Sequence, residues 1–350
     1  MSVLAGAVLA STVSSVGYVI VVLTLIAFGV AVFINIRRAR AETGSELELA
    51  PNRVPHHPDE ILEGPVLNRN LAFGLGAIVI ISIGLPVYWL GEPARNEGAQ
   101  ATFDRVAAER GAEQFAVTAE GGLNCAGCHG GMDAPGGVAP YTINDANGEF
   151  VASVEWQAPA LNTVLLRFDE EELYDILVYG RPFSPMPAWG IEGGGALNDQ
   201  QIGNLIAYLK TIQITPEEAQ AAATDALADA MASGQYETEG EALFNLGLYD
   251  GFAGGAYACG RCHTQGWSYG EPESDGDGAL GPNLTAVRSQ FPGGAAGFQE
   301  QVDFVTEGSV KGVLYGAHGQ GTGRMPGFDD MLTDEQIQAI VEYERNLGDD

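Results

Sequence analysis

Two long uncharged stretches near the N-terminus dominate the hydrophobic pattern of the chain. The first 36 residues carry no charged side chain and are most apolar over Val16–Ile36, and a second uncharged run covers Leu71–Leu90. About 20 consecutive apolar residues suffice to cross a bilayer as a helix. The pattern therefore predicts two transmembrane helices, at residues 1–36 and 71–91, joined by a polar linker at 37–70.

Each run has a rival interpretation. A cleaved signal peptide needs a positively charged start and a short apolar core, but no Lys or Arg precedes the first run, which is also too long. The second run could be a buried helix of a soluble domain. Its length without a charge favours a membrane span, as do Tyr88 and Trp89 at its end, where aromatic side chains prefer the interface.

Arginine placement predicts the orientation of the spans. The linker holds five of the 16 basic residues of the chain, whereas the part after Leu90 holds 40 of the 46 acidic ones. Cytoplasmic loops carry the excess of Lys and Arg. We therefore expect a multi-pass protein of the bacterial cytoplasmic membrane, in contact with lipid through two spans, with the N-terminus and residues 92–350 on the outer side.

The outer part shows helical patterns arranged as two repeats. Residues 197–212 and 332–347 each open with a capping box and continue with apolar residues at helical spacing. An Ala- and acid-rich segment at 214–235, with Pro216 at its first helical position, predicts a connecting helix. We expect a mainly α fold with a first repeat (92–213) and a second repeat (236–350), held near each other without a large shared core.

The formal net charge of -30 limits the choice of partners. A strongly acidic surface disfavours nucleic acid and favours a basic protein partner. A general acidity of exported proteins in the source organism would produce the same balance.

All four cysteines lie in two copies of one motif, Cys125-Ala-Gly-Cys128-His129 and Cys259-Gly-Arg-Cys262-His263. C-x-x-C-H is the attachment signature of c-type haem, in which each thiol adds to a vinyl group and the adjacent His ligates the iron. The motifs predict two haem c groups, with His129 and His263 as proximal ligands.

Other uses of paired cysteines fit less well. A zinc site needs its two cysteine pairs ~15–20 residues apart, whereas 131 positions separate Cys128 from Cys259. A thioredoxin-like pair needs a βαβ context, which neither motif has. Disulfides within each motif would close small strained rings.

The motifs sit in a longer pattern. Gly and Phe four residues apart precede each motif, at Gly111 and Phe115 and at Gly240 and Phe244; a Met-Pro pair and a closing helix follow it. This order resembles the class I cytochrome c fold. The resemblance implies Met186 and Met325 as the second axial ligands, and Pro159 and Pro282 as residues whose backbone orients the proximal His.

Alternatives stay open at these positions. Each Met could be core filler, since Met is adaptable, and each Pro could simply belong to a turn. His318 lies seven residues before Met325 and could ligate the second iron instead, because imidazole is a common iron ligand.

Iron with two protein ligands leaves no open position, so the sequence favours an electron carrier over an enzyme, with no catalytic residues of its own. The chain is similar to membrane diheme subunits of respiratory complexes, which exchange electrons with redox partner proteins. A quinol-oxidising cytochrome bc-type complex is preferred, and subunit III of a cbb-type oxidase is the alternative. A diheme enzyme such as a peroxidase, or a free-standing membrane-tethered shuttle, are the remaining hypotheses.

Overall fold

The computed structural model describes residues 63–181, 184–248, 258–313 and 324–348, and helical residues at 19, 22–24, 26–34 and 36–37. The chain divides into two compact units, Met1–Thr102 and Phe103–Asp350. His318 and most of the predicted cytoplasmic linker lie outside the described residues.

The second predicted span forms helix α3, Pro65–Leu90, of which no residue is buried. Among the described residues, it is the helix long and apolar enough to cross a membrane, and a shorter apolar helix covers Val22–Ile34 of the first predicted span. α3 begins six residues before the predicted Leu71. Pro65 occupies its first turn, where a missing N–H costs no hydrogen bond, so the helix extends through the polar residues 68–70.

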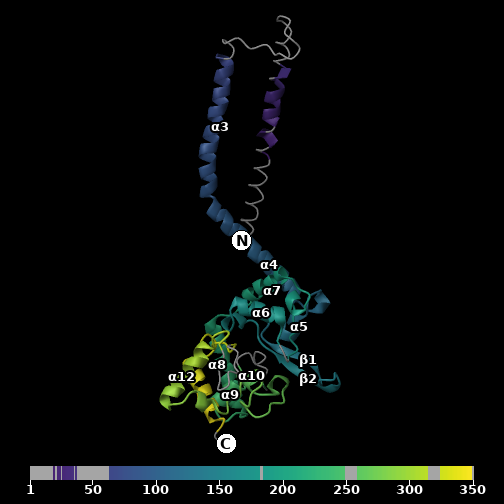
Figure 1. The fold of residues 1–350 in the computed structure, drawn as a ribbon, viewed down its shortest axis with the longest axis vertical. Helices are drawn as coiled ribbons and strands as arrows, with labels where there is room; N and C mark the ends of the chain where they lie inside the picture. The colour runs from purple at the N-terminus through teal and green to yellow at the C-terminus, as the bar shows by residue number, and fades with distance from the viewer. Residues whose placement is uncertain are drawn as a thin grey trace. The chain divides into compact units, whose positions relative to one another are not determined.

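The prediction of a mainly helical chain is confirmed. After α3 come α4 (Glu92–Phe115), α5 (Cys125–His129), β1 (Gly137–Asn144), β2 (Phe150–Ala158), α6 (Glu170–Tyr179), α7 (Asp199–Thr211), α8 (Pro216–Ser233), α9 (Glu239–Phe244), α10 (Gly260–His263), α11 (Val287–Gln290), α12 (Ala295–Glu307) and α13 (Asp334–Asn346) (Figure 1). The β1–β2 pair was not predicted.

In the first repeat, the end of α4 crosses the closing helix α7. Gly111 allows this approach, because a Cβ there would lie 2.7 Å from the Cβ of Tyr208. The rings of Phe115 and Tyr208 pack with centroids 5.1 Å apart. Asn198 and Gln201 form the predicted capping box at the start of α7. A glycine and an aromatic pair therefore hold the two helices that frame the repeat.

The second repeat uses the same crossing between α9 and α13. A Cβ on Gly240 would lie 2.8 Å from the Cβ of Tyr343, and the rings of Phe244 and Tyr343 are 5.3 Å apart. Thr333 forms the predicted capping box of α13 with Gln336. The sequence repeat is thus also a structural repeat.

The connecting helix α8 does more than link the repeats. Five residues along one face of α8 are buried in the core of the second repeat, with Phe244, Ile337 and Ile340: Ala219, Ala223, Ala226, Leu227 and Ala230. α8 lies against α9 (Figure 1). The connecting helix is therefore also part of the core of the second repeat, because small alanine side chains let it pack closely.

The β1–β2 hairpin of the first repeat reaches the second repeat. The strands pair antiparallel, with Gly137 opposite Ala158. The Gln157 side chain donates to the Leu248 carbonyl at 3.1 Å, and the Trp156 ring lies 5.7 Å from that of Tyr269. Since residues 103–350 form one compact unit, this contact lies within it.

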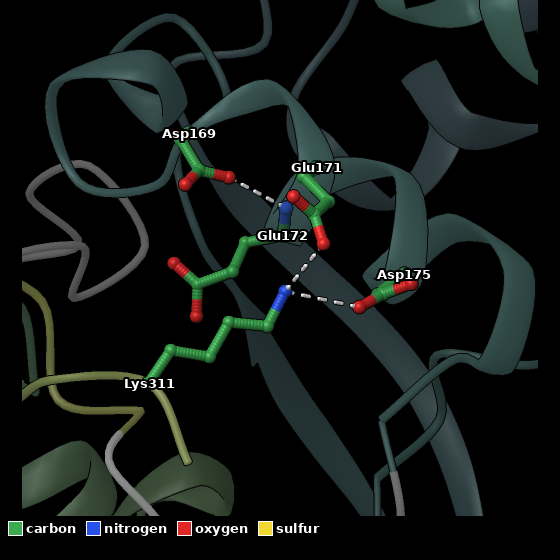
Figure 2. Close-up of polar contacts among 5 residues, drawn as sticks. All are labelled: Asp169, Glu171, Glu172, Asp175 and Lys311. Atoms are coloured by element: carbon green, nitrogen blue, oxygen red, sulfur yellow. Dashed lines mark hydrogen bonds and ion pairs between the residues drawn. The ribbon is translucent and has the colours of Figure 1, made fainter. Parts of the chain in front are cut away.

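An ion-pair cluster joins the repeats at a second place. Lys311 extends from the loop after α12 and places its Nζ 3.5 Å from Glu171 and 3.3 Å from Asp175, both on α6 (Figure 2). Asp169, drawn beside them, caps α6 by accepting from the Glu172 backbone N–H. These side chains are well exposed, so the pairs add little stability.

Candidate haem sites

The paired-thiol motifs form short helices that follow the crossing helices α4 and α9 along the chain. In the first repeat Cys125, Cys128 and His129 lie on α5, and in the second Cys259 precedes α10, which carries Cys262 and His263. One helical turn places two thiols and an imidazole within one local segment. The four thiols are not joined as disulfides.

Burial favours the protonated thiol at the first cysteine of each motif. It raises the pKa of Cys125 to about 11 and raises that of Cys259 well above its ordinary value. Structural zinc is bound by thiolates, which such burial disfavours. Among the described residues, no group of three or more His, Cys, Asp and Glu side chains could hold a metal ion. The thiols therefore suit covalent attachment better than a zinc site.

The two histidines have the same geometry. His129 and His263 are buried, and the Nδ1 of each lies 2.8 Å from a proline carbonyl, Pro159 for the first and Pro282 for the second. A carbonyl oxygen only accepts, so Nδ1 carries the proton and donates it. The lone pair of Nε2 is then available to a metal, the arrangement that orients a histidine ligand.

Electrostatics keeps both imidazoles neutral. Burial lowers the pKa of His129 to about 4, against the opposing hydrogen bond to the Pro159 carbonyl, and nearby Arg261 and Arg167 lower it further. Burial likewise lowers the pKa of His263. A neutral imidazole is the form that ligates iron. Without reference to a cofactor, the structure thus holds two imidazoles in the tautomer that a haem would need.

The residue before each proline differs between the repeats. A Cβ on Gly281 would lie 2.5 Å from Cε1 of His263 and 2.8 Å from its Nδ1, so this glycine lets the backbone touch the ring. In the first repeat the same place is taken by Ala158, the last residue of β2. The hairpin therefore ends at the proline that meets His129.

The two Met-Pro segments contact the chain in the same way, at a glycine that the sequence analysis did not single out. α6 and α12 each end at a glycine with positive φ, Gly180 at 70° and Gly308 at 78°. A Cβ on either glycine would lie 2.7 Å from the carbonyl oxygen of the methionine, Met186 or Met325. The residue after each glycine donates its N–H to that same carbonyl, at 3.1 and 2.9 Å. In both repeats this glycine could have been recognised from the sequence, since it ends a helix and precedes the Met-Pro pair, by six residues in the first repeat and 17 in the second.

Each methionine packs against the core that holds its own motif. Met186 and Cys125 both lie against the core of the first repeat, and Met325 lies against the core that contains Cys259. Met325 is further fixed because its N–H donates to Ser309 Oγ at 2.8 Å. The structure therefore brings one predicted thiol and the predicted thioether of each repeat to one core.

Arginines gather between the two motifs. The guanidinium groups of Arg167 and Arg181 lie over the Phe168 ring, 5.5 and 5.3 Å from its centroid. Arg261, inside the second motif, acts on His129 of the first, and Arg181 of the first repeat interacts with Cys262 of the second. Arg181 and Arg261 thus each act electrostatically on a residue of the other repeat.

Two thiols in one short segment, a buried imidazole and a methionine at the core that the first thiol of the motif also contacts are the features expected of a c-type cytochrome site. In agreement, residues 106–209 match the family model described as cytochrome c oxidase, cbb3-type, subunit III. The first repeat is therefore a cytochrome c domain, which implies covalently bound haem c and a role in electron transfer. No curated protein and no solved structure matches the chain.

Proposed function

We propose that the chain carries two haem c groups and transfers electrons as the membrane-anchored cytochrome c subunit of a respiratory complex. One observation supports the presence of the second haem. The segment around His263 repeats the geometry around His129, down to the 2.8 Å contact between Nδ1 and a proline carbonyl. Two sites built alike support two cofactors of one kind.

The proposed attachments follow the motifs. Cys125 and Cys128 bind the first haem and Cys259 and Cys262 the second. His129 with Met186, and His263 with Met325, are the proposed axial pairs. His318 remains the alternative to Met325. A haem held by imidazole and thioether supplies reversible one-electron chemistry.

The surrounding residues orient the proposed ligands and exclude water from them. The Nδ1–H contacts fix the ring planes, the Gly180 and Gly308 turns hold the methionine carbonyls, and burial of both histidines excludes water from the ligand side. With both axial positions filled from the protein, a substrate has no place to bind. This supports a carrier and argues against a peroxidase-like enzyme.

The membrane anchor rests on composition. α3 and the earlier apolar run are the proposed spans, and the arginine-rich linker is proposed to face the cytoplasm. The haem domains then lie outside, where c-type haem is attached. The acidic surface suits a basic redox partner.

Two complexes fit this role. The sequence of the linker led us to prefer a quinol-oxidising cytochrome bc-type complex, while the family match of residues 106–209 supports the cbb-type oxidase. Purification in mild detergent separates them, since a cytochrome b and a Rieske protein accompany the chain in the first and oxidase subunits in the second. A chain that purifies alone indicates the free-standing shuttle.

The haem content is the decisive test. The full chain, produced in a host that matures c-type cytochromes, should contain two haems by mass and by the spectrum of the denatured haem. The variant with Cys259→Ser and Cys262→Ser should retain one, and the matched variant with Cys125→Ser and Cys128→Ser should retain the other. A wild-type chain with one haem or none would refute the proposal, and a high-spin oxidised spectrum would favour the enzyme.

A further inference from the structure

The cores of the two repeats differ at one pair of buried positions. When the two repeats are aligned at Gly180 and Gly308, Leu173 of α6 corresponds to Gln301 of α12. When they are aligned at Tyr208 and Tyr343, Leu209 corresponds to Glu344. All four side chains are buried, with at most 4% of their surface exposed. A leucine pair in the first repeat thus becomes an amide and a carboxyl in the second.

The polar pair is hydrogen-bonded. The Nε2 of Gln301 donates to Oε2 of Glu344 at 2.9 Å. The orientation of the amide is set from its other end, where Arg345 donates to Oε1 of Gln301 at 3.1 Å. Glu344 therefore has a fixed position, and its neighbours on α13, Ile340 and Val341, are fully buried and apolar. Acidic residues are almost never fully buried, so this position calls for a reason.

Cys259 of the second motif lies in the same buried core as Ile340 and Val341, the apolar residues that precede Glu344 on α13. The charge of Glu344 is one of the causes that raise the pKa of the Cys259 thiol, which is a proposed point of covalent attachment and not an iron ligand. Burial raises the pKa of Glu344 itself to about 7, although the hydrogen bond from Gln301 opposes this. The carboxyl can therefore change its protonation near neutral pH.

The other charged groups around α13 have different partners. Arg288 of α11 donates to the Arg345 carbonyl, and Asp275 accepts from Tyr343. Asp303 of α12 accepts from Gln299. The remaining titratable groups of the adjoining helices are the exposed Glu239, Glu300 and Glu307 and the half-buried Glu241, which accepts from the Glu237 N–H.

We propose that Glu344 is a proton-binding group coupled to the redox state of the second haem, so that one of the two haems exchanges a proton with its electron. This rests on the proposed function. When the second site gains one electron from the first haem, the Glu344 carboxylate takes one proton from solvent; when that electron passes to the acceptor, the carboxylic acid releases the proton. Leu209 leaves the first haem without such a group.

Redox titration of the full matured chain tests this, with both midpoint potentials measured at a series of pH values across neutrality. One midpoint should fall as pH rises, towards a limiting slope of about 59 mV for each tenfold change in proton concentration, and the other should stay nearly constant. Glu344→Gln should flatten the sloping midpoint. Glu342→Gln, an exposed position on the same helix, is the matched control and should leave the slope intact.

Two further measurements cover a variant that does not fold. The double variant Gln301→Leu and Glu344→Leu restores the pair of the first repeat and should flatten the same midpoint. In the wild type, the infrared difference between reduced and oxidised protein should contain a carboxylic acid band. Two pH-independent midpoints in a chain with two haems, or a slope retained in Glu344→Gln, would overturn this inference alone; a chain without two haems would overturn the proposed function.

Discussion

The crossing of α4 and α7 gives the sharpest test of the fold, through the substitution Gly111→Ala. The added Cβ would lie 2.6 Å from the backbone carbon of Asn204 and 2.7 Å from the Cβ of Tyr208. Carbon atoms in contact prefer about 3.5–4.0 Å. The neighbouring atoms are backbone atoms of Asn204 and the Cβ of Tyr208, which are fixed to α7 and do not move aside as the end of a flexible side chain would. The helices must therefore separate by about 1 Å.

Separation would loosen the contact between Phe115 and Tyr208, whose ring centroids are 5.1 Å apart. Overpacking of this kind costs about 1–3 kcal/mol, and the better helix propensity of Ala returns at most about 1 kcal/mol. We expect a net loss of about 2 kcal/mol in the free energy of unfolding. Denaturant titration followed by circular dichroism and by the haem absorption would measure it.

Gly203→Ala is the matched control on α7. No atom lies within 4 Å of a Cβ built there, so this substitution should gain up to about 1 kcal/mol from helix propensity alone. If Gly111→Ala proves as stable as the wild type, or if both variants shift stability equally, the close crossing is not what holds the first repeat together.

Three other substitutions have defined outcomes. Gly281→Ala should displace the His263 ring and reduce the low-spin fraction of one haem in the absorption spectrum; an unchanged spectrum contradicts the contact. Lys311→Met should lower the free energy of unfolding by less than about 1 kcal/mol, since its ion pairs are exposed, and a larger loss in denaturant titration would show that they matter more. Because burial raises the pKa of Glu344 from 4.5 to about 7, the stability that depends on its neutral form is complete below 4.5 and is lost as pH rises through 7. Glu344→Gln should remove up to about 3 kcal/mol of this decline, as measured by unfolding at several pH values, and an unaltered pH dependence would argue against it.

The features that could be predicted from the sequence are those set by local rules. The capping boxes of α7 and α13 and the start of α8 at Pro216 depend on residues within one helical turn, and the structure contains all three. The Cys-x-x-Cys-His motifs were equally visible, because haem attachment demands a short fixed spacing. The role of the motif residues as ligands stays a prediction.

The missed features depend on distant contacts or weak patterns. β1 has one buried residue and no regular alternation of apolar and polar positions, so little identifies it as a strand. β2 does alternate from Ala152 to Ala158 and could have been recognised. The buried face of α8 was recognisable in principle, since Ala219, Ala223, Ala226 and Ala230 recur at helical spacing, but alanine carries a weak hydrophobic signal. The burial of Glu344 could not be foreseen from a residue type that is normally exposed.

The packing of α8 has a consequence for the rate of electron transfer between the proposed haems. A connecting segment that buries its alanines in the second core cannot swing as a hinge, and the hairpin contact from Gln157 to Leu248 secures the repeats at another point. Under the proposed function, an electron then crosses between the haems over a constant gap. Its rate should be insensitive to solvent viscosity, unlike that of carrier domains that must diffuse on a tether before each hop.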